Sequence, residues 1–184
     1  KDVNGNLYFP SLGVQTLNTL SPGMGYMIYM TEQGNLIYPS NSTPRKPFVN
    51  KTPSAEILIP TYSATGNNCT AILEFDDKYE GMEAGAFSSQ GLLLGSGKIN
   101  NGFVAMTIWG DDVHTDMLDG ARDLELIDFK LLTGKGNLRS IRTGSIFELI
   151  SKKDSAGIYY QENAIYQAKA IVEQNEPQEE IIKC

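Results

Sequence analysis

Hydrophobic and polar residues alternate in short runs along much of the chain, which is the pattern of β-strands. The clearest run is 102–109, where apolar or small side chains occupy both faces of the expected strand. One face carries Phe103, Ala105, Thr107 and Trp109, and the other carries Val104, Met106 and Ile108. A strand that is apolar on both faces is buried between two layers. The pattern therefore predicts that this strand lies inside a β-sandwich.

Similar runs recur through residues 57–172, separated by turns rich in Gly, Asn and Ser. The predicted strands cover residues 57–59, 69–75, 84–87, 92–99, 102–109, 124–132, 145–151 and 164–172. Such spacing is typical of an antiparallel sandwich. We therefore predict an all-β, antiparallel, Ig-like β-sandwich. A helix is a second interpretation of residues 161–174, which contain good helix formers, but their period of two favours a strand.

The regions that flank this sandwich differ from it in composition. Residues 1–40 contain several turn signals between short apolar runs, which predicts a small β-meander appendage that leans on the main domain. Residues 41–56 are rich in Ser, Asn, Thr, Pro and Lys and are expected to form a linker. Residues 173–184 form an acidic tail without strand periodicity. Because the chain starts at Lys1 in mid-pattern, we expect it to be part of a longer protein.

Charge and apolar-run length exclude two classes of partner. The formal net charge is -7 and the isoelectric point is near 4.7, so no nucleic acid is expected to bind. No apolar run approaches the ~20 residues of a membrane-spanning helix. The only cysteines are Cys69 and Cys184, and the only histidine is His114, which excludes the known zinc spacings. Cys69 is interpreted as a small buried hydrophobe, and whether it pairs with Cys184 stays open.

The turn after the central strand carries four carboxylates, Asp111, Asp112, Asp116 and Asp119, followed by Gly120. Calcium takes six to eight oxygen ligands, so this turn is the candidate metal site, and calcium is the one candidate cofactor. The spacing does not match an EF-hand loop. The other interpretation is that these side chains accept backbone N–H bonds within a long turn, as Asp commonly does.

No catalytic signature is found in the sequence, so we expect a protein that is not an enzyme. The chain has no Gly-x-Ser-x-Gly elbow, and no pair of carboxylates is singled out as glycosidase acids. Trp109 ends a buried strand and is expected to pack in the core. Tyr159 and Tyr160 follow Gly157 and are the candidate exposed aromatic platform for a ligand, with packing in the sandwich as the alternative.

Several motifs together resemble a module of Bacteroidetes secreted and cell-surface proteins. They are, in this chain, Asp2–Pro10, Leu20–Met30 with its Pro-Gly-Met-Gly-Tyr segment, Leu36–Pro39, Gly81–Phe87, Gly91–Ser96, Ala105–Asp112 and Asp119-Gly120. The resemblance implies type IX secretion, an extracellular location and a sorting domain after residue 184. Met82 departs from the pattern, which usually has an acidic residue there. Asp154-Ser155-Ala156 resembles the O-glycosylation pattern of that phylum, which makes Ser155 a candidate glycan site.

The expected function is therefore that of a non-enzymatic extracellular module, structural or adhesive, in a larger secreted or surface-attached bacterial protein. Its expected partners are other domains of the same long chain and a glycan or another cell-surface component. One alternative is a carbohydrate-binding accessory domain of a secreted hydrolase. Another is a structural subunit of a virion or tail fibre, which would also use short-strand domains with acidic turns.

Overall fold

The computed structural model describes residues 1–30, 32–35, 37, 55–62, 65–134 and 136–174. Within these ranges the regular elements are strands and two short 3-10 helices, η1 (Pro10–Leu12) and η2 (Asp77–Tyr79). In chain order the strands are β1 (Tyr8–Phe9), β2 (Val14–Gln15), β3 (Asn68–Glu74), β4 (Glu83–Phe87), β5 (Leu93–Lys98), β6 (Phe103–Trp109), β7 (Asp128–Thr133), β8 (Asn137–Glu148), β9 (Lys153–Ser155) and β10 (Ile165–Val172). The all-β prediction is confirmed. No helix in the described part is long and apolar enough to span a membrane.

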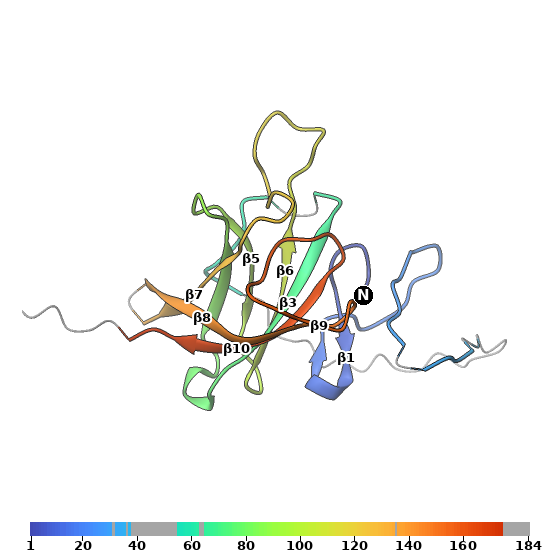
Figure 1. Cartoon of the computed structure of the whole chain (residues 1–184), viewed down its shortest axis with the longest axis horizontal. Coiled ribbons are helices and arrows are strands. Elements are labelled where there is room, and N and C mark those ends of the chain that lie inside the picture. Colours follow the sequence, from blue (N-terminus) through green and yellow to red (C-terminus); the bar gives the residue numbers. More distant parts are fainter. Residues whose placement is uncertain (31, 36, 38–54, 63–64, 135, 175–184) are drawn as a thin grey trace, which may run out of the picture.

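The main sheet has the strand order β5-β4-β7-β8-β10-β3-β6, with β9 added alongside β8 (Figure 1). Its two end strands, β5 and β6, lie against each other, so the sheet curls until it is nearly closed. The sandwich prediction is therefore confirmed only in part. The opposed walls exist, but they belong to one continuous curled sheet instead of two separate sheets.

The prediction that all strands are antiparallel is wrong at one position. Strand β10 pairs in parallel with β3, from Ile165 opposite Thr70 to Lys169 opposite Glu74. Short turns force neighbouring strands to be antiparallel, but β3 and β10 are the first and last strands of the main sheet. They are hydrogen-bonded neighbours within the strand order, and no local turn signal in the sequence reports that pairing.

Strand boundaries agree with the predictions best where both ends of a run are marked by turns. Strands β3 to β6 lie within one residue of their predicted bounds, and the last predicted run forms β10 and is not a helix. Residues 57–59 are not a strand, and Ile57 and Ile59 are 71% and 68% exposed. Strand β7 begins at Asp128 instead of Leu124, whose φ of 58° is incompatible with a strand. Strand β8 begins eight residues earlier than predicted, and β9 was not predicted.

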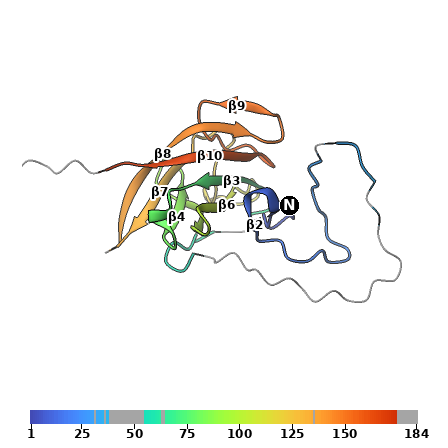
Figure 2. The same cartoon turned by 90° about the horizontal axis from the view of Figure 1, so that it is seen from below.

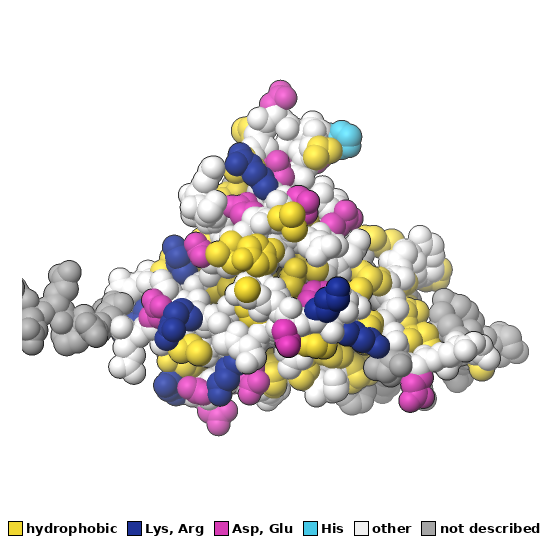
Figure 3. Space-filling model, viewed as in Figure 1, with side chains coloured by type: hydrophobic (Ala, Val, Ile, Leu, Met, Phe, Trp, Pro, Cys, Tyr) yellow, Lys and Arg dark blue, Asp and Glu magenta, His cyan; other side chains and the backbone are white. Residues whose placement is uncertain are grey.

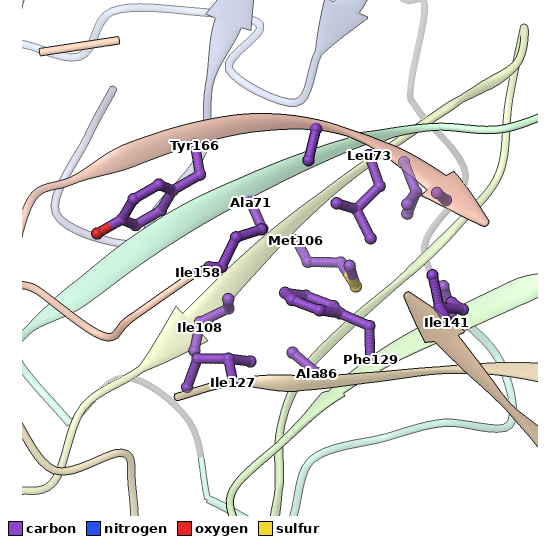
Figure 4. Packing of buried hydrophobic residues seen from close by; sticks show 14 of the residues in the cluster. Ala71, Leu73, Ala86, Met106, Ile108, Ile127, Phe129, Ile141, Ile158 and Tyr166 are labelled. Carbon is purple, nitrogen blue, oxygen red and sulfur yellow. The ribbon is translucent and has the colours of Figure 1, made fainter. Parts of the chain in front are cut away.

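The core fills the inside of the curled sheet (Figure 4). Met106 and Ile108 of β6 point into it from one wall, and Phe129 of β7 points into it from the other. Both β6 side chains are fully buried, and so is Leu73 of β3. Burial of such side chains contributes about 1.5–3 kcal/mol each and is the main force that closes the sheet.

The outer face of β6 and β3 is covered by the N-terminal residues (Figure 2). Leu7 and Val14 of this segment pack with Ile72 of β3 and Ile165 of β10 in a second, smaller cluster. The hydroxyl of Thr107 donates a hydrogen bond to the carbonyl of Gly5 at 3.2 Å. Strand β6 is thus fully buried on its inner face and half-buried on its outer face, where the appendage supplies a partial second layer.

The predicted N-terminal meander is only partly formed. Strands β1 and β2 make a two-stranded antiparallel sheet, and Asp2 forms an isolated bridge with Tyr26. The run after Tyr26 continues without a regular strand in the described residues. Leu36, Tyr38 and most of the predicted linker and tail lie outside the described residues.

Closure of the sheet depends on glycine in β5, which gives a direct test. A Cβ atom on Gly95 would lie 2.0 Å from the carbonyl oxygen of Thr107 in β6. We expect Gly95→Ala to lower the free energy of unfolding by about 2–3 kcal/mol. The added methyl group would collide with the backbone of β6, which cannot move aside as a flexible side chain can. The control is Gly144→Ala in β8, where the nearest atom is 3.5 Å away and the change should stay within about 0.5 kcal/mol. Urea denaturation measures both, and equal stability of the two variants would contradict the close approach of β5 to β6.

Candidate functional site

A loop between β6 and β7 projects from the end of the sheet (Figure 1). We call residues 111–120 the acidic loop. Its ends are joined, because Asp111 N–H donates to the carbonyl of Ala121 at 2.9 Å and Ala121 N–H donates to that of Trp109 at 2.9 Å. Gly120 lies so close to Gly110 that a Cβ atom would be 2.1 Å from the Gly110 carbonyl. The base of the loop is therefore fixed to the sheet.

The aspartates predicted as a calcium site hold the loop together through hydrogen bonds. Asp111 accepts the N–H of Asp119 at 3.0 Å, and Asp119 accepts the N–H of Asp112 at 2.9 Å. Asp112 in turn accepts the N–H of His114 at 2.9 Å. The second oxygen of Asp119 accepts the hydroxyl of Thr115 at 3.1 Å, while Asp116 is exposed. This geometry favours the interpretation that the carboxylates stabilise the turn.

The described residues contain no group of three or more His, Cys, Asp or Glu side chains that could hold a metal ion. The four aspartates are near one another in sequence but are not gathered as a ligand set, and calcium binding stays a prediction. The acidic loop instead presents apolar side chains: Val113 is 84% exposed and Met117 is 60% exposed. Histidine, acidic and apolar side chains share this projection (Figure 3).

The two tyrosines of the predicted platform have different environments. The hydroxyl of Tyr160, which is buried, donates to Asn67 Oδ1 at 3.1 Å, and burial raises the Tyr160 pKa. Tyr159 is 38% exposed, and its ring lies over Gly157, where a Cβ atom would be 3.2 Å from the ring. The Leu126 side chain also lies next to Gly157 and is 49% exposed. We call Leu126 and Tyr159 the tyrosine platform; Tyr160 belongs to the core.

Ser155, the candidate glycan site, is half-buried in β9. Its hydroxyl donates a hydrogen bond of 2.6 Å to the carbonyl of Gly157. The adjacent Asp154 is exposed. The hydroxyl therefore has an intramolecular partner next to the tyrosine platform, and glycosylation of Ser155 stays a prediction.

The remaining candidates from the sequence lie apart from these surfaces. Cys69 is fully buried and has no disulfide partner among the described residues, and burial raises its pKa to about 12, as expected of a small hydrophobic side chain. Cys184 lies outside the described residues. Trp109 is buried at the end of β6, which agrees with its predicted packing role.

Sequence reasoning missed the structural role of three glutamates. Glu83 in β4 is 6% exposed and accepts the backbone N–H groups of Glu56 at 2.7 Å, Ile57 at 3.0 Å and Leu58 at 2.8 Å. Burial pushes the Glu83 pKa upward, but these three donors outweigh it and hold the pKa below its ordinary value. Glu83 thereby ties the segment before β3 to the sheet. A glutamate within an apolar strand pattern was the one available signal.

Glu148 and Glu125 act in the same way at other junctions. Glu148 accepts N–H groups from Ile150 at 2.9 Å, from Ser151, and from Ile165 at 3.3 Å, so it joins the end of β8 to the start of β10. Glu125 accepts the N–H and the hydroxyl of Ser89. Burial again opposes these hydrogen bonds, and again the bonds win and lower both pKa values. Such carboxylates are ionised, fixed acceptors.

Acid should weaken the fold through these glutamates. The folded-state pKa of Glu83 lies below the ordinary 4.5, so its contribution is present above that value and is lost as the pH falls through the folded pKa. We expect Glu83→Gln to lower the free energy of unfolding at pH 7 by about 1–3 kcal/mol. The difference from wild type should shrink toward pH 3. Glu74→Gln, at the exposed end of β3, is the control and should be neutral. A Glu83→Gln effect that grows on acidification would contradict this role.

The two interpretations of the acidic loop predict different responses to calcium. If Asp119 serves as an acceptor for loop amides, Asp119→Ala should lower stability by about 1 kcal/mol equally in calcium and in chelator. The thermal midpoint of the wild type should also be the same in both. Asp116→Ala, at the exposed tip, should have no effect. A midpoint that rises with calcium and no longer does so in Asp119→Ala would instead establish a metal site by mass action.

Comparison with known proteins adds no assignment: no family model, no curated protein and no solved structure matches this chain.

Proposed function

We propose that this chain is a non-enzymatic extracellular module, structural or adhesive, of a larger secreted or surface-attached bacterial protein. The observation that carries the proposal is the acidic loop. Its base is fixed to a closed β body, its carboxylates brace its own backbone, and its tip presents Val113 and Met117 to solvent. A rigid scaffold that displays a loop is the usual arrangement of a recognition module.

The shifted pKa values of three glutamates, of Cys69 and of Tyr160 support a role without catalysis. Catalytic acids and bases have pKa values moved toward the working pH. Here the pKa values of Glu83, Glu125 and Glu148 are lowered, and those of Cys69 and Tyr160 are raised. At neutral pH the first group is therefore more firmly ionised and the second more firmly neutral. Each of these five shifts moves a group away from proton exchange near pH 7, while burial lowers the pKa values of the two Lys1 ammonium groups.

The extracellular location rests on the resemblance of the motifs to Bacteroidetes secreted and surface proteins. The acidic composition is compatible with that location, and other domains of the same long chain are the first expected partners. Exposed apolar side chains on a braced loop favour a contact with a protein or cell-surface component, since the free energy falls when a partner removes such side chains from water.

A second candidate function, carbohydrate binding, is favoured by the tyrosine platform. The Tyr159 ring lies against the backbone of Gly157, while 38% of the residue stays exposed. A ring held in this way resembles the surface on which the apolar face of a sugar can stack. Leu126 extends the apolar area beside it.

The two functions are separated by one binding experiment. The chain, tetramerised for avidity, is applied to a glycan array and to immobilised extracellular proteins. We expect Val113→Ser with Met117→Ser to weaken binding at least tenfold, because burial of each apolar side chain by a partner contributes about 1.5–3 kcal/mol to the binding free energy. The control is Leu138→Ser, which removes an apolar side chain that is 43% exposed from β8, away from the loop. Binding lost in Tyr159→Ala but kept in Tyr159→Phe would favour the sugar platform. Substrate turnover by purified wild type on ester, glycoside or peptide panels would overturn the proposal.

A further inference from the structure

A large apolar groove lies beside the N-terminal segment, away from the acidic loop. It has a volume of about 1150 Å³ and lies between the β1–β2 hairpin, residues 26–30 and 32–34, and the connection that follows β8. Its lining includes Leu7, Phe9, Tyr26, Ile28, Tyr29 and Ile150. We call this surface the N-terminal groove. The segments that form it are the hairpin and the extended N-terminal chain seen beside the body in Figure 2.

The N-terminal groove has the composition of an interface core. Aromatic residues and Met are enriched where proteins meet, and the groove holds Tyr, Phe and Met side chains together. Several are open to solvent: Tyr8 is 55%, Ile28 is 57% and Met30 is 51% exposed. An apolar surface of this kind on a soluble chain marks a contact site.

The charge at the rim of the groove is opposite to that of the acidic loop. The Lys152 ammonium lies 6.0 Å from the centre of the Tyr29 ring, at the edge of the groove, and Lys1 and Glu32 are among the lining residues. The loop carries Asp112, Asp116 and Asp119 around its apolar tip. One part of the molecule is thus an apolar projection with an acidic surround, and another is an apolar groove where two lysines, Lys1 and Lys152, outnumber one carboxylate, Glu32.

We propose that the acidic loop of one copy docks in the N-terminal groove of a second copy. Val113 and Met117 would be covered by the apolar lining, while the aspartates approach Lys152. Because the two surfaces are different parts of one chain, the contact is heterologous and leaves a free loop at one end and a free groove at the other. Copies would therefore add head to tail. The inference deepens the proposed structural role and rests on it.

Sedimentation velocity over a concentration series tests this with the protein alone. The loop variant is Val113→Ser with Met117→Ser, the groove variant is Ile28→Ser with Ile150→Ser, and Leu138→Ser is the control. We expect wild type and Leu138→Ser to associate in a concentration-dependent way that weakens with salt. Each double variant alone should be at least tenfold weaker in association. An equimolar mixture of the two should form a 1:1 complex, because one partner keeps its groove and the other its loop.

The mixture makes the proposal falsifiable even where a variant is less stable, and thermal melts confirm that both variants fold. A wild type that remains monomeric up to about 1 mM, the weak limit of specific association, would overturn the inference. Association of wild type without complex formation in the mixture would also overturn it, since the interface would then lie elsewhere. A monomer that still binds an immobilised protein through its loop would end this inference alone. Substrate turnover by the purified protein would contradict the proposed function, while the sedimentation result would still test the contact between copies.

Discussion

The contact on which the rest of the structure depends is the approach of β5 to the backbone of β6. Gly95 and Gly97 allow it, since a Cβ atom on Gly97 would also be 2.6 Å from Val104. This contact brings the two ends of the sheet together, and it thereby encloses the apolar side chains that point inward from β3, β4 and β7. Without it the sheet would be an open surface with two unprotected end strands, which is the arrangement that natural sheets avoid.

Closure also explains why the N-terminal segment is needed. Strand β6 is apolar on both faces, and the curled sheet covers only its inner face. Leu7 and Val14 cover part of the outer face of the neighbouring strands, and the Gly5 carbonyl accepts the hydroxyl of Thr107. The N-terminal hairpin is too short to be stable by itself, so each part supplies the apolar surface that the other lacks. The same hairpin then forms one wall of the N-terminal groove.

The sequence predicted what local periodicity controls and missed what distant segments control. Strands β3 to β6 could be predicted because alternation and turn residues act over a few positions. The parallel pairing of β10 with β3 and the three donors to Glu83 come from segments far apart in the chain. The period of two could have separated Tyr159 from Tyr160, because neighbouring residues in an extended chain face opposite sides. The sequence allowed two roles for the loop aspartates, as calcium ligands or as acceptors for backbone N–H groups, and only the geometry could weigh one against the other.

Ionised groups in this protein are divided between two uses, and the division bears on function. Glu83, Glu125 and Glu148 are saturated by hydrogen-bond donors at junctions of the sheet, where they fix connections in place. Asp111, Asp112 and Asp119 of the acidic loop accept hydrogen bonds from the loop backbone and so brace the loop from within. A loop that is ordered before it meets a partner loses little conformational entropy on binding, so the gain from covering its apolar tip is kept as affinity. This arrangement of charges is therefore the physical basis of the proposed display role.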